Sequence, residues 1–130
     1  MNPRGEQTIL TPSQVGQYIK SFMDRDRLLS GLLVRGELSN YKRYPSGHHY
    51  FTLKDGEGAL RCVMFRSDAA SLRFQPQNGM QVIAAGRVTV FPRDGQYQLY
   101  CVRLTPEGAG DLAVAFEQLK ARLLQEGIFD

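Results

Sequence analysis

Two short runs of the sequence, residues 48–54 and 60–66, alternate apolar residues with cations and aromatic rings. Successive residues of a β-strand point to opposite faces, so each run predicts one apolar face and one mixed face. The mixed face, with contributions from a preceding run and from the position just past the second run, collects Arg35, His48, Tyr50, Thr52, Lys54, Arg61, Phe65 and Arg66. Cations attract phosphates and exposed rings stack on bases, so this chemistry suits single-stranded nucleic acid. The alternative is that Tyr50 and Phe65 cover the sheet beneath a helix or a partner domain.

A second candidate is the segment 40–48, NYKRYPSGH, in which two cations are interleaved with two tyrosines. Lys42 and Arg43 are predicted to contact phosphates, and the proline and glycine that follow favour a turn. Two adjacent basic residues are also common at a solvated hairpin tip, so that interpretation stays open. A further predicted loop, residues 92–95, offers only Arg93, with Asp94 beside it.

Residue combinations typical of catalysis or metal binding are missing from the sequence. His48 and His49 are neighbours on a predicted strand and so face opposite sides. The sequence contains no Cys-X-X-Cys and no His-Glu-X-X-His motif, so it signals no zinc site. Cys62 and Cys101 lie in separate apolar runs, which predicts reduced, buried thiols and a cytoplasmic protein. We therefore expect a binding module with no metal, no cofactor and no catalytic residue in this chain.

Length and charge set further bounds. The 130 residues, 42% of them hydrophobic, fit one domain with its own core, and no apolar run is long enough to cross a membrane. The net charge of +3 permits an anionic partner without requiring one. Residues 1–66 hold 10 basic and 6 acidic side chains and residues 67–130 hold 6 and 7, so the excess lies in the first half.

Apolar periodicity and turn signals predict the elements that position these residues. Thr11 to Gln14 form a capping box, which predicts a helix whose stripe includes Val15, Ile19 and Phe22. Period-two runs predict strands over 32–39, 48–54, 60–65, 81–91 and 96–104, with the segment 40–47 as a loop. Gly86 predicts a bulge in the fourth strand. The buried face of the fifth strand is ambiguous.

Short helical segments complete the predicted order. One or two turns are expected over 67–74, capped by Ser67 or Asp68, and a last helix from Asp111 to Gly127. The fold class is therefore mainly β: a five-stranded OB-fold barrel with an N-terminal helix, a short helix between strands 3 and 4, and a C-terminal helix. A generic five-stranded α+β sheet is the alternative. Such barrels bind oligonucleotides on strands 2 and 3 and on the loops joining strands 1–2 and 4–5.

Three segments resemble the N-terminal domain of the exodeoxyribonuclease VII large subunit: GELSN at 36–40, SGHHYFTLKD at 46–55 and RCVMFR at 61–66. The similarity returns at 116–120 and 126–130, FEQLK and EGIFD. The resemblance implies an OB-fold that engages single-stranded DNA, within a cytoplasmic complex of large and small subunits that degrades single-stranded DNA from both ends. It implies that Phe65 and Arg66 contact DNA. It also implies that the nuclease centre lies beyond this chain, which is therefore expected to be inactive alone.

These arguments together predict a domain plan and a site. Residues 1–10 are expected to be a flexible segment, 11–108 the OB-fold nucleic-acid-binding domain, and 109–130 a helix leading into an absent catalytic domain. The expected partners are single-stranded DNA and, through absent regions, the small subunit. The predicted nucleic-acid-binding residues are Arg35, Lys42, Arg43, His48, Tyr50, Arg61, Phe65, Arg66 and Arg93. The alternative function is a protein-docking OB-fold domain that does not bind nucleic acid directly.

Overall fold

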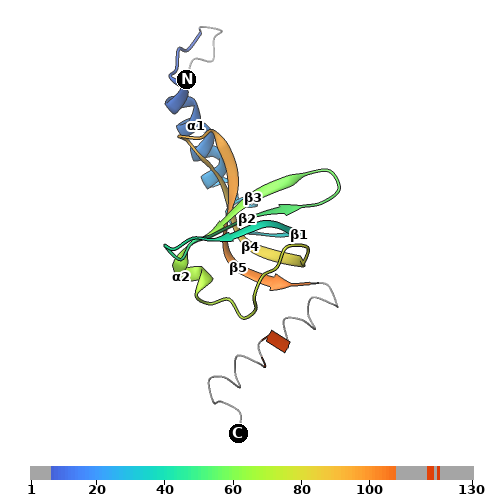
Figure 1. Cartoon of the computed structure of the whole chain (residues 1–130). Coiled ribbons are helices and arrows are strands. Elements are labelled where there is room, and N and C mark those ends of the chain that lie inside the picture. Colours follow the sequence, from blue (N-terminus) through green and yellow to red (C-terminus); the bar gives the residue numbers. More distant parts are fainter. Residues whose placement is uncertain (1–6, 108–116, 119, 121–130) are drawn as a thin grey trace.

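Five strands close into a barrel in the part of the chain that the structure, a computed structural model, describes: residues 7–107, 117, 118 and 120 (Figure 1). In chain order the elements are α1 (Pro12–Arg25), β1 (Leu32–Arg43), β2 (His49–Lys54), β3 (Ala59–Met64), α2 (Arg66–Ala69), β4 (Gln81–Phe91) and β5 (Gln96–Pro106). Around the barrel the strand order is β1-β2-β3-β5-β4, with β4 closing onto β1. Only the β3–β5 pairing is parallel among these strands. The predicted OB-fold is thereby confirmed over the open α+β sheet, because the sheet is closed.

The barrel interior holds the apolar residues that the period-two runs placed there. Leu38, Phe51, Leu53, Cys62 and Met64 are each at most 3% exposed. The predicted core positions nearer the start of β1, at 32 and 34, are only half-buried. Both cysteines are free and buried as predicted, and burial raises the pKa of each thiol.

β1 continues through residues 40–43, which the sequence pattern predicts to be a loop. Asn40 has a φ of 53°, a left-handed conformation that asparagine tolerates better than most residues, and the register of β1 against β2 shifts between Ser39 and Lys42. After this bulge, Lys42 pairs with Tyr50 and Arg43 with His49. The prediction was wrong here because a bulge interrupts the alternation without ending the strand.

β4 and β5 are long, bent strands that carry a second bulge, at the predicted Gly86. Their register shifts between Ala85, which pairs with Arg103, and Gly86, which pairs with Cys101. The backbones approach so closely that a Cβ on Gly86 would lie 2.1 Å from the carbonyl oxygen of Tyr100. The shift also resolves the ambiguity of the fifth strand. Leu99 and Cys101 face the core before the bulge, and Leu104 faces it afterwards.

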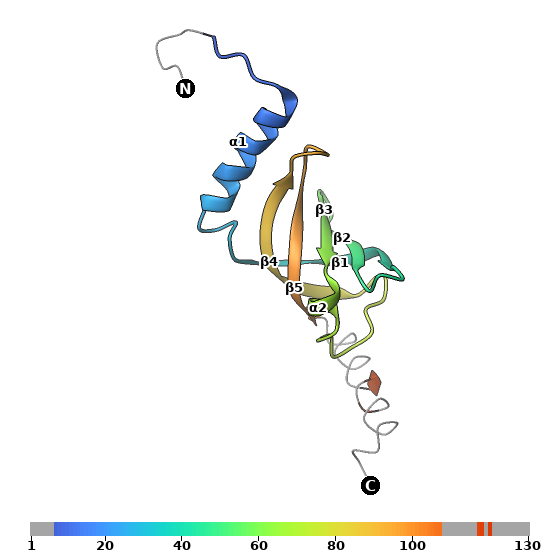
Figure 2. The same cartoon turned by 90° about the vertical axis from the view of Figure 1, so that its left-hand side faces the viewer.

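α1 lies along the outside of β4 (Figure 2). Its predicted capping box is present: the backbone N–H of Gln14 donates to the Thr11 hydroxyl, and the Gln14 side-chain oxygen accepts from the Thr11 backbone N–H. Gly16 is the buried residue of α1 and packs against Pro92, so closely that a Cβ on Gly16 would lie 3.2 Å from it. The apolar stripe faces away from the barrel instead, and its members Val15, Tyr18, Ile19 and Phe22 are 44–58% exposed.

α2 is shorter and begins earlier than predicted. It spans Arg66–Ala69, its N-cap is Phe65, and no side chain caps it, so the predicted capping by Ser67 or Asp68 was wrong. The carbonyl of Phe65 instead accepts the backbone N–H groups of Asp68 and Ala69. β3 therefore passes into α2 at Phe65, at one end of the barrel beside β5 (Figure 1).

The predicted C-terminal helix falls largely outside the described residues, so it stays a prediction. The described Gln118 accepts a hydrogen bond from the backbone N–H of Gln75 and donates one to its carbonyl. Within the described part of the chain, no helix has the length and apolar character needed to span a membrane.

Candidate nucleic-acid interface

A groove of about 700 Å³ crosses the outer surface of β2, β3 and β5. Its two ends are the β1–β2 connection and the β4–β5 hairpin, the loop positions that OB-folds use for oligonucleotides. We call it the front groove. Its lining is Asn40, Lys42, Tyr44, Tyr50, Phe51, Thr52, Arg61, Cys62, Val63, Phe65, Phe91, Asp94, Gln98 and Tyr100.

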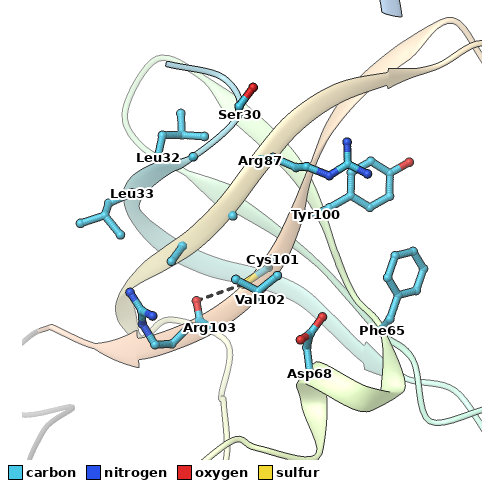
Figure 3. A pocket seen from close by; sticks show the side chains of 13 residues that line it. Ser30, Leu32, Leu33, Phe65, Asp68, Arg87, Tyr100, Cys101, Val102 and Arg103 are labelled. Carbon is cyan, nitrogen blue, oxygen red and sulfur yellow. Dashed lines mark hydrogen bonds between the residues drawn. The ribbon is translucent and has the colours of Figure 1, made fainter. Parts of the chain in front are cut away.

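Four of the aromatic rings that line the front groove form two contacting pairs. The ring of Tyr44 meets that of Tyr50 edge-on, with centroids 5.0 Å apart. The ring of Phe65 stacks on that of Tyr100, with centroids 5.7 Å apart and an interplanar angle of 24° (Figure 3). Tyr44, Tyr50 and Phe65 remain 40–46% exposed. The groove therefore presents ring surface to solvent, and these side chains do not close under another part of the described chain.

The cations of the front groove are Lys42 and Arg61. Lys42 makes no hydrogen bond or ion pair with any described side chain, and Arg61 donates only to the neutral amide oxygen of Gln96, at 2.7 Å. Asp94 is the opposing carboxylate of the lining. Elsewhere on the barrel, by contrast, Arg35 pairs with the Glu107 carboxylate at 2.7 Å. The groove thus retains positive charge available to an anionic ligand.

His48 and Arg66 lie beside the front groove, at the junction of β3 with α2. The Nδ1 atom of His48 accepts the backbone N–H of Arg66 at 3.0 Å, and its ring meets Phe65 edge-on at 5.4 Å. The stem of Arg66 lies against Gly47, where a Cβ would come within 2.7 Å of it. Gly47 also has a φ of 92°, so glycine is required there for both backbone and space. His48 consequently fixes the point at which β3 turns into α2.

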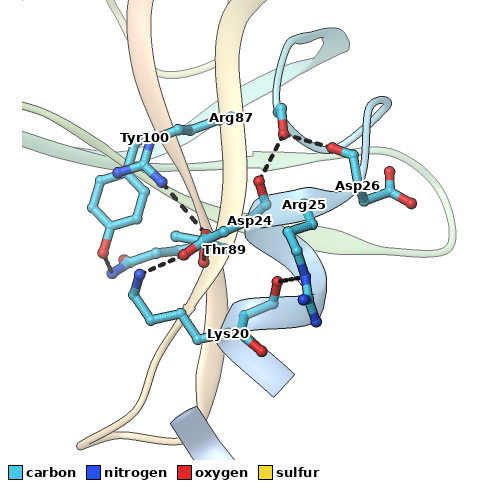
Figure 4. Close-up of polar contacts among 10 residues, drawn as sticks. Lys20, Asp24, Arg25, Asp26, Arg87, Thr89 and Tyr100 are labelled. Atoms are coloured by element: carbon cyan, nitrogen blue, oxygen red, sulfur yellow. Dashed lines mark hydrogen bonds and ion pairs between the residues drawn. The ribbon is translucent and has the colours of Figure 1, made fainter. Parts of the chain in front are cut away.

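Tyr100 also contacts a polar cluster that extends from β4 to α1 (Figure 4). The guanidinium of Arg87 lies 5.1 Å from the Tyr100 ring centroid and 3.7 Å from Asp24 Oδ1. Asp24 also accepts from the Lys20 ammonium at 2.6 Å and from the Thr89 hydroxyl at 2.7 Å. Hydrogen bonds from these two groups lower the pKa of Asp24 below its ordinary value, so it is ionised at neutral pH. The Tyr100 ring of the front groove is therefore linked through Arg87 and Asp24 to Lys20 of α1.

The structure distributes the predicted site residues over three places. Lys42, Tyr50, Arg61 and Phe65 line the front groove, and His48 and Arg66 stand beside it. Arg43 at the end of β1 and Arg93 in the β4–β5 turn are exposed but do not line it. Arg35 is engaged by Glu107 and also lies outside the lining. That any of these residues contacts nucleic acid stays a prediction.

Several lining residues were absent from the predicted set. The rings among them are Tyr44, Phe51, Phe91 and Tyr100, and the polar side chains are Asn40, Thr52, Asp94 and Gln98. The signals in the sequence that point to them are the tyrosine-rich segment 40–48 for Tyr44, the mixed strand face for Thr52 and the 92–95 loop for Asp94. Tyr100 was missed because the face of β5 was ambiguous. In β5 the apolar residues of the core occupy odd positions up to Cys101 and an even position, Leu104, after it. This change of alternation is the sequence signal that places Tyr100 on the outer face of the barrel.

Comparisons with known proteins agree with the OB-fold barrel. A family model described as an OB-fold nucleic acid binding domain matches residues 10–105. The exodeoxyribonuclease 7 large subunit of Ruminiclostridium cellulolyticum is 52% identical over 122 residues, 94% of this chain and 30% of that protein. That of Clostridium acetobutylicum is 53% identical over 121 residues, 93% of this chain and again 30% of the relative. The chain thus spans about a third of the length of these relatives.

Among solved structures, one chain of a replication protein A heterotrimer bound to single-stranded DNA shares the fold, with a TM-score of 0.50 and 16% identity. The likeness covers 75% of this chain and 74% of that one. At this identity the likeness concerns the fold alone. The family match, in contrast, spans all five strands of the described barrel, and the chain belongs to the OB-fold nucleic acid binding domain family.

Proposed function

We propose that the front groove binds single-stranded DNA and that the chain is the N-terminal DNA-binding module of an exodeoxyribonuclease VII large subunit. One observation carries the proposal: exposed rings at positions 44, 50 and 65 share a groove with Lys42 and Arg61. Unpaired bases stack on exposed aromatic rings, and the phosphates of their backbone are attracted to cations. In a duplex the bases are stacked on one another, so their faces are not available to these rings. The relatives' name supports DNA as the polymer.

Each class of side chain has a distinct role in this proposal. Tyr50, Phe65 and Tyr44 stack on bases, at about 1–3 kcal/mol per base and with little preference among bases. Lys42 and Arg61 contact phosphates, so binding weakens as salt rises. His48 and Arg66 act as positioning residues through the β3–α2 junction, and the Arg66 guanidinium also reaches the backbone of the bound strand.

In the whole protein, this module delivers single-stranded DNA to a hydrolytic centre. We place the residues that cleave phosphodiester bonds in the part of the relatives' length that this chain does not span, so that the chain alone binds without cutting. The whole protein then degrades single-stranded DNA from both ends in the cytoplasm, together with copies of a small subunit that attach outside this domain.

A titration of the chain with fluorescein-labelled oligothymidine at two salt concentrations tests the binding. We expect saturable binding that weakens with salt, and a loss of most affinity in the double variant Phe65→Ala with Arg66→Ala. Phe22→Ala is the control, because it removes an exposed ring from α1, away from the groove. Binding of the double variant as tight as the parent's, at equal salt and with unchanged thermal unfolding, would show that the site is wrongly assigned.

A second candidate function, docking to protein, is favoured by the exposed stripe of α1. Val15, Tyr18, Ile19 and Phe22 form an apolar surface that the described barrel leaves uncovered. If docking were the main role, the chain would show no oligonucleotide-induced NMR shifts in the front groove. The Phe22→Ala control would then weaken assembly with the rest of the large subunit while leaving DNA binding unaltered.

A further inference from the structure

A second groove of about 520 Å³ adjoins the front groove at Phe65 and Tyr100, which line both. Figure 3 shows the lining of this second groove. It lies over β1, β4 and β5 at the Gly86 bulge, outside the strand 2 and 3 face that OB-folds commonly use. We call it the back groove. Its lining is Ser30, Gly31, Leu32, Leu33, Phe65, Asp68, Ala85, Gly86, Arg87, Tyr100, Cys101, Val102 and Arg103.

The two grooves meet at the stacked rings of Phe65 and Tyr100, which line both of them. The pair therefore forms a shared wall, and a flexible strand that crosses it passes from one groove into the other. In Figure 3 the guanidinium of Arg87 crosses the Tyr100 ring, while Arg103 and Leu33 lie on the opposite side of the view. The back groove thus extends away from the shared wall along the barrel surface.

The charges and exposed apolar atoms of the back groove match a sugar-phosphate backbone. Arg103 makes no side-chain hydrogen bond or ion pair with the described residues, so its charge is available. Arg87 is directed towards Asp24 but remains about half exposed, at 52%. Leu33 and Val102, 65% and 50% exposed, offer apolar surface that sugar rings can cover. Asp68 is the one carboxylate of the lining and opposes an anionic ligand.

We propose that the back groove is a second subsite for the same single strand, holding the backbone of nucleotides that flank those in the front groove. The inference rests on the proposed function and extends the path beyond the known face of the fold. Arg103 contacts a phosphate, Leu33 and Val102 contact sugars, and Asp68 weakens the site. The shared ring wall favours a continuous polymer over a separate small anion, because a free anion would gain nothing from the neighbouring groove.

Oligothymidines of two lengths separate the subsites. One OB-fold covers about 4–16 nucleotides, so a strand of about 4 fits one groove and a strand of about 16 is long enough for both. Arg103→Ala should weaken binding of the long strand several-fold and lower its salt slope by about 0.7, with no effect on the short strand. Asp68→Asn should strengthen binding of the long strand only. Arg27→Ala is the matched control, because it removes an exposed arginine from outside both grooves.

The outcomes distinguish this inference from the function on which it rests. If the parent binds neither length, both proposals fail. If the parent binds both lengths but Arg103→Ala and Asp68→Asn behave like the parent and like Arg27→Ala, the back groove is not a subsite and the front groove stands. Equal weakening of both lengths by Arg103→Ala also overturns the inference. Backbone NMR shifts at Gly31 and Val102 that appear only with the long strand would support it independently, without any substitution.

Discussion

The ring of Phe65 lies nearly parallel to the ring of Tyr100, with centroids 5.7 Å apart, although the two residues are separated by the whole of α2, β4 and half of β5. The parallel pairing of β3 with β5, in which Val63 aligns with Tyr100, brings them together. Each ring borders both grooves. The closure of the barrel, and no local motif, therefore creates the centre of the proposed binding surface.

Tyr100→Ala should reduce affinity for single-stranded DNA by about 1–3 kcal/mol, the loss expected for one stacked base. Because the Tyr100 ring also supports Phe65, the loss should not add to that of Phe65→Ala. A double-mutant cycle measured by fluorescence anisotropy checks both statements. Strictly additive losses would mean that the two rings act on DNA independently.

Lys42→Ala should lower the slope of log affinity against log salt by about 0.7, because one phosphate contact is lost. Arg35→Ala serves as its control, since that guanidinium is already paired with Glu107 and lies outside both grooves. Titrations at several salt concentrations measure the slope. Equal slopes for parent and Lys42→Ala would remove Lys42 from the proposed contact set.

Gly86→Ala should destabilise the barrel by roughly 3 kcal/mol or more, because the new Cβ would overlap the Tyr100 carbonyl and force the strands apart. Gly56→Ala is the matched control, since a Cβ there meets nothing within 4 Å. Urea denaturation of both variants measures the difference. Similar unfolding free energies for the two variants would show that the bulge relaxes freely.

Asp24→Ala should cost about 1–3 kcal/mol of stability, because Thr89 is 2% exposed and its hydroxyl would lose its partner. Adding Thr89→Val should recover part of the loss, since the buried donor is then removed as well. Thermal unfolding of the single and double variants measures the recovery. A double variant less stable than Asp24→Ala would indicate that Thr89 has another role in the core.

His49 should make stability fall as the solution is acidified below about pH 6.5. Burial lowers the pKa of His49 beneath its ordinary 6.5, so the unfolded chain binds the proton first, and protonation favours unfolding. His49 Nδ1 also shares a hydrogen bond with the Tyr41 hydroxyl. Urea denaturation at about pH 8 and about pH 5 measures the free energy of unfolding, which should fall less on acidification in His49→Asn than in the parent. Identical pH profiles would place the cause elsewhere.

The sequence by itself predicted the order of the described helices and strands, though not all of their boundaries, and much of one face. Local signals are sufficient where the interaction is local: the Thr11 capping box, the alternation that buries Phe51 and Leu53, and the glycine that marks the β4 bulge. The cations and rings of β2 and β3 share a face for the same reason, because strand periodicity fixes their side. The order of these elements predicted a five-stranded OB-fold barrel with a generic α+β sheet as the alternative, and the closure of the sheet decided between them.

The tertiary structure alone decided which of these residues meet. The bulge in β1 carries Lys42 onto the groove, whereas Arg35, on the same strand, is neutralised by Glu107, which follows β5. The bulge between β4 and β5 turns Tyr100 outward against Phe65. Such register shifts and pairings join residues far apart in the chain, and their energies depend on barrel closure. The contact that results between Phe65 and Tyr100 is not encoded by the periodicity of either strand alone.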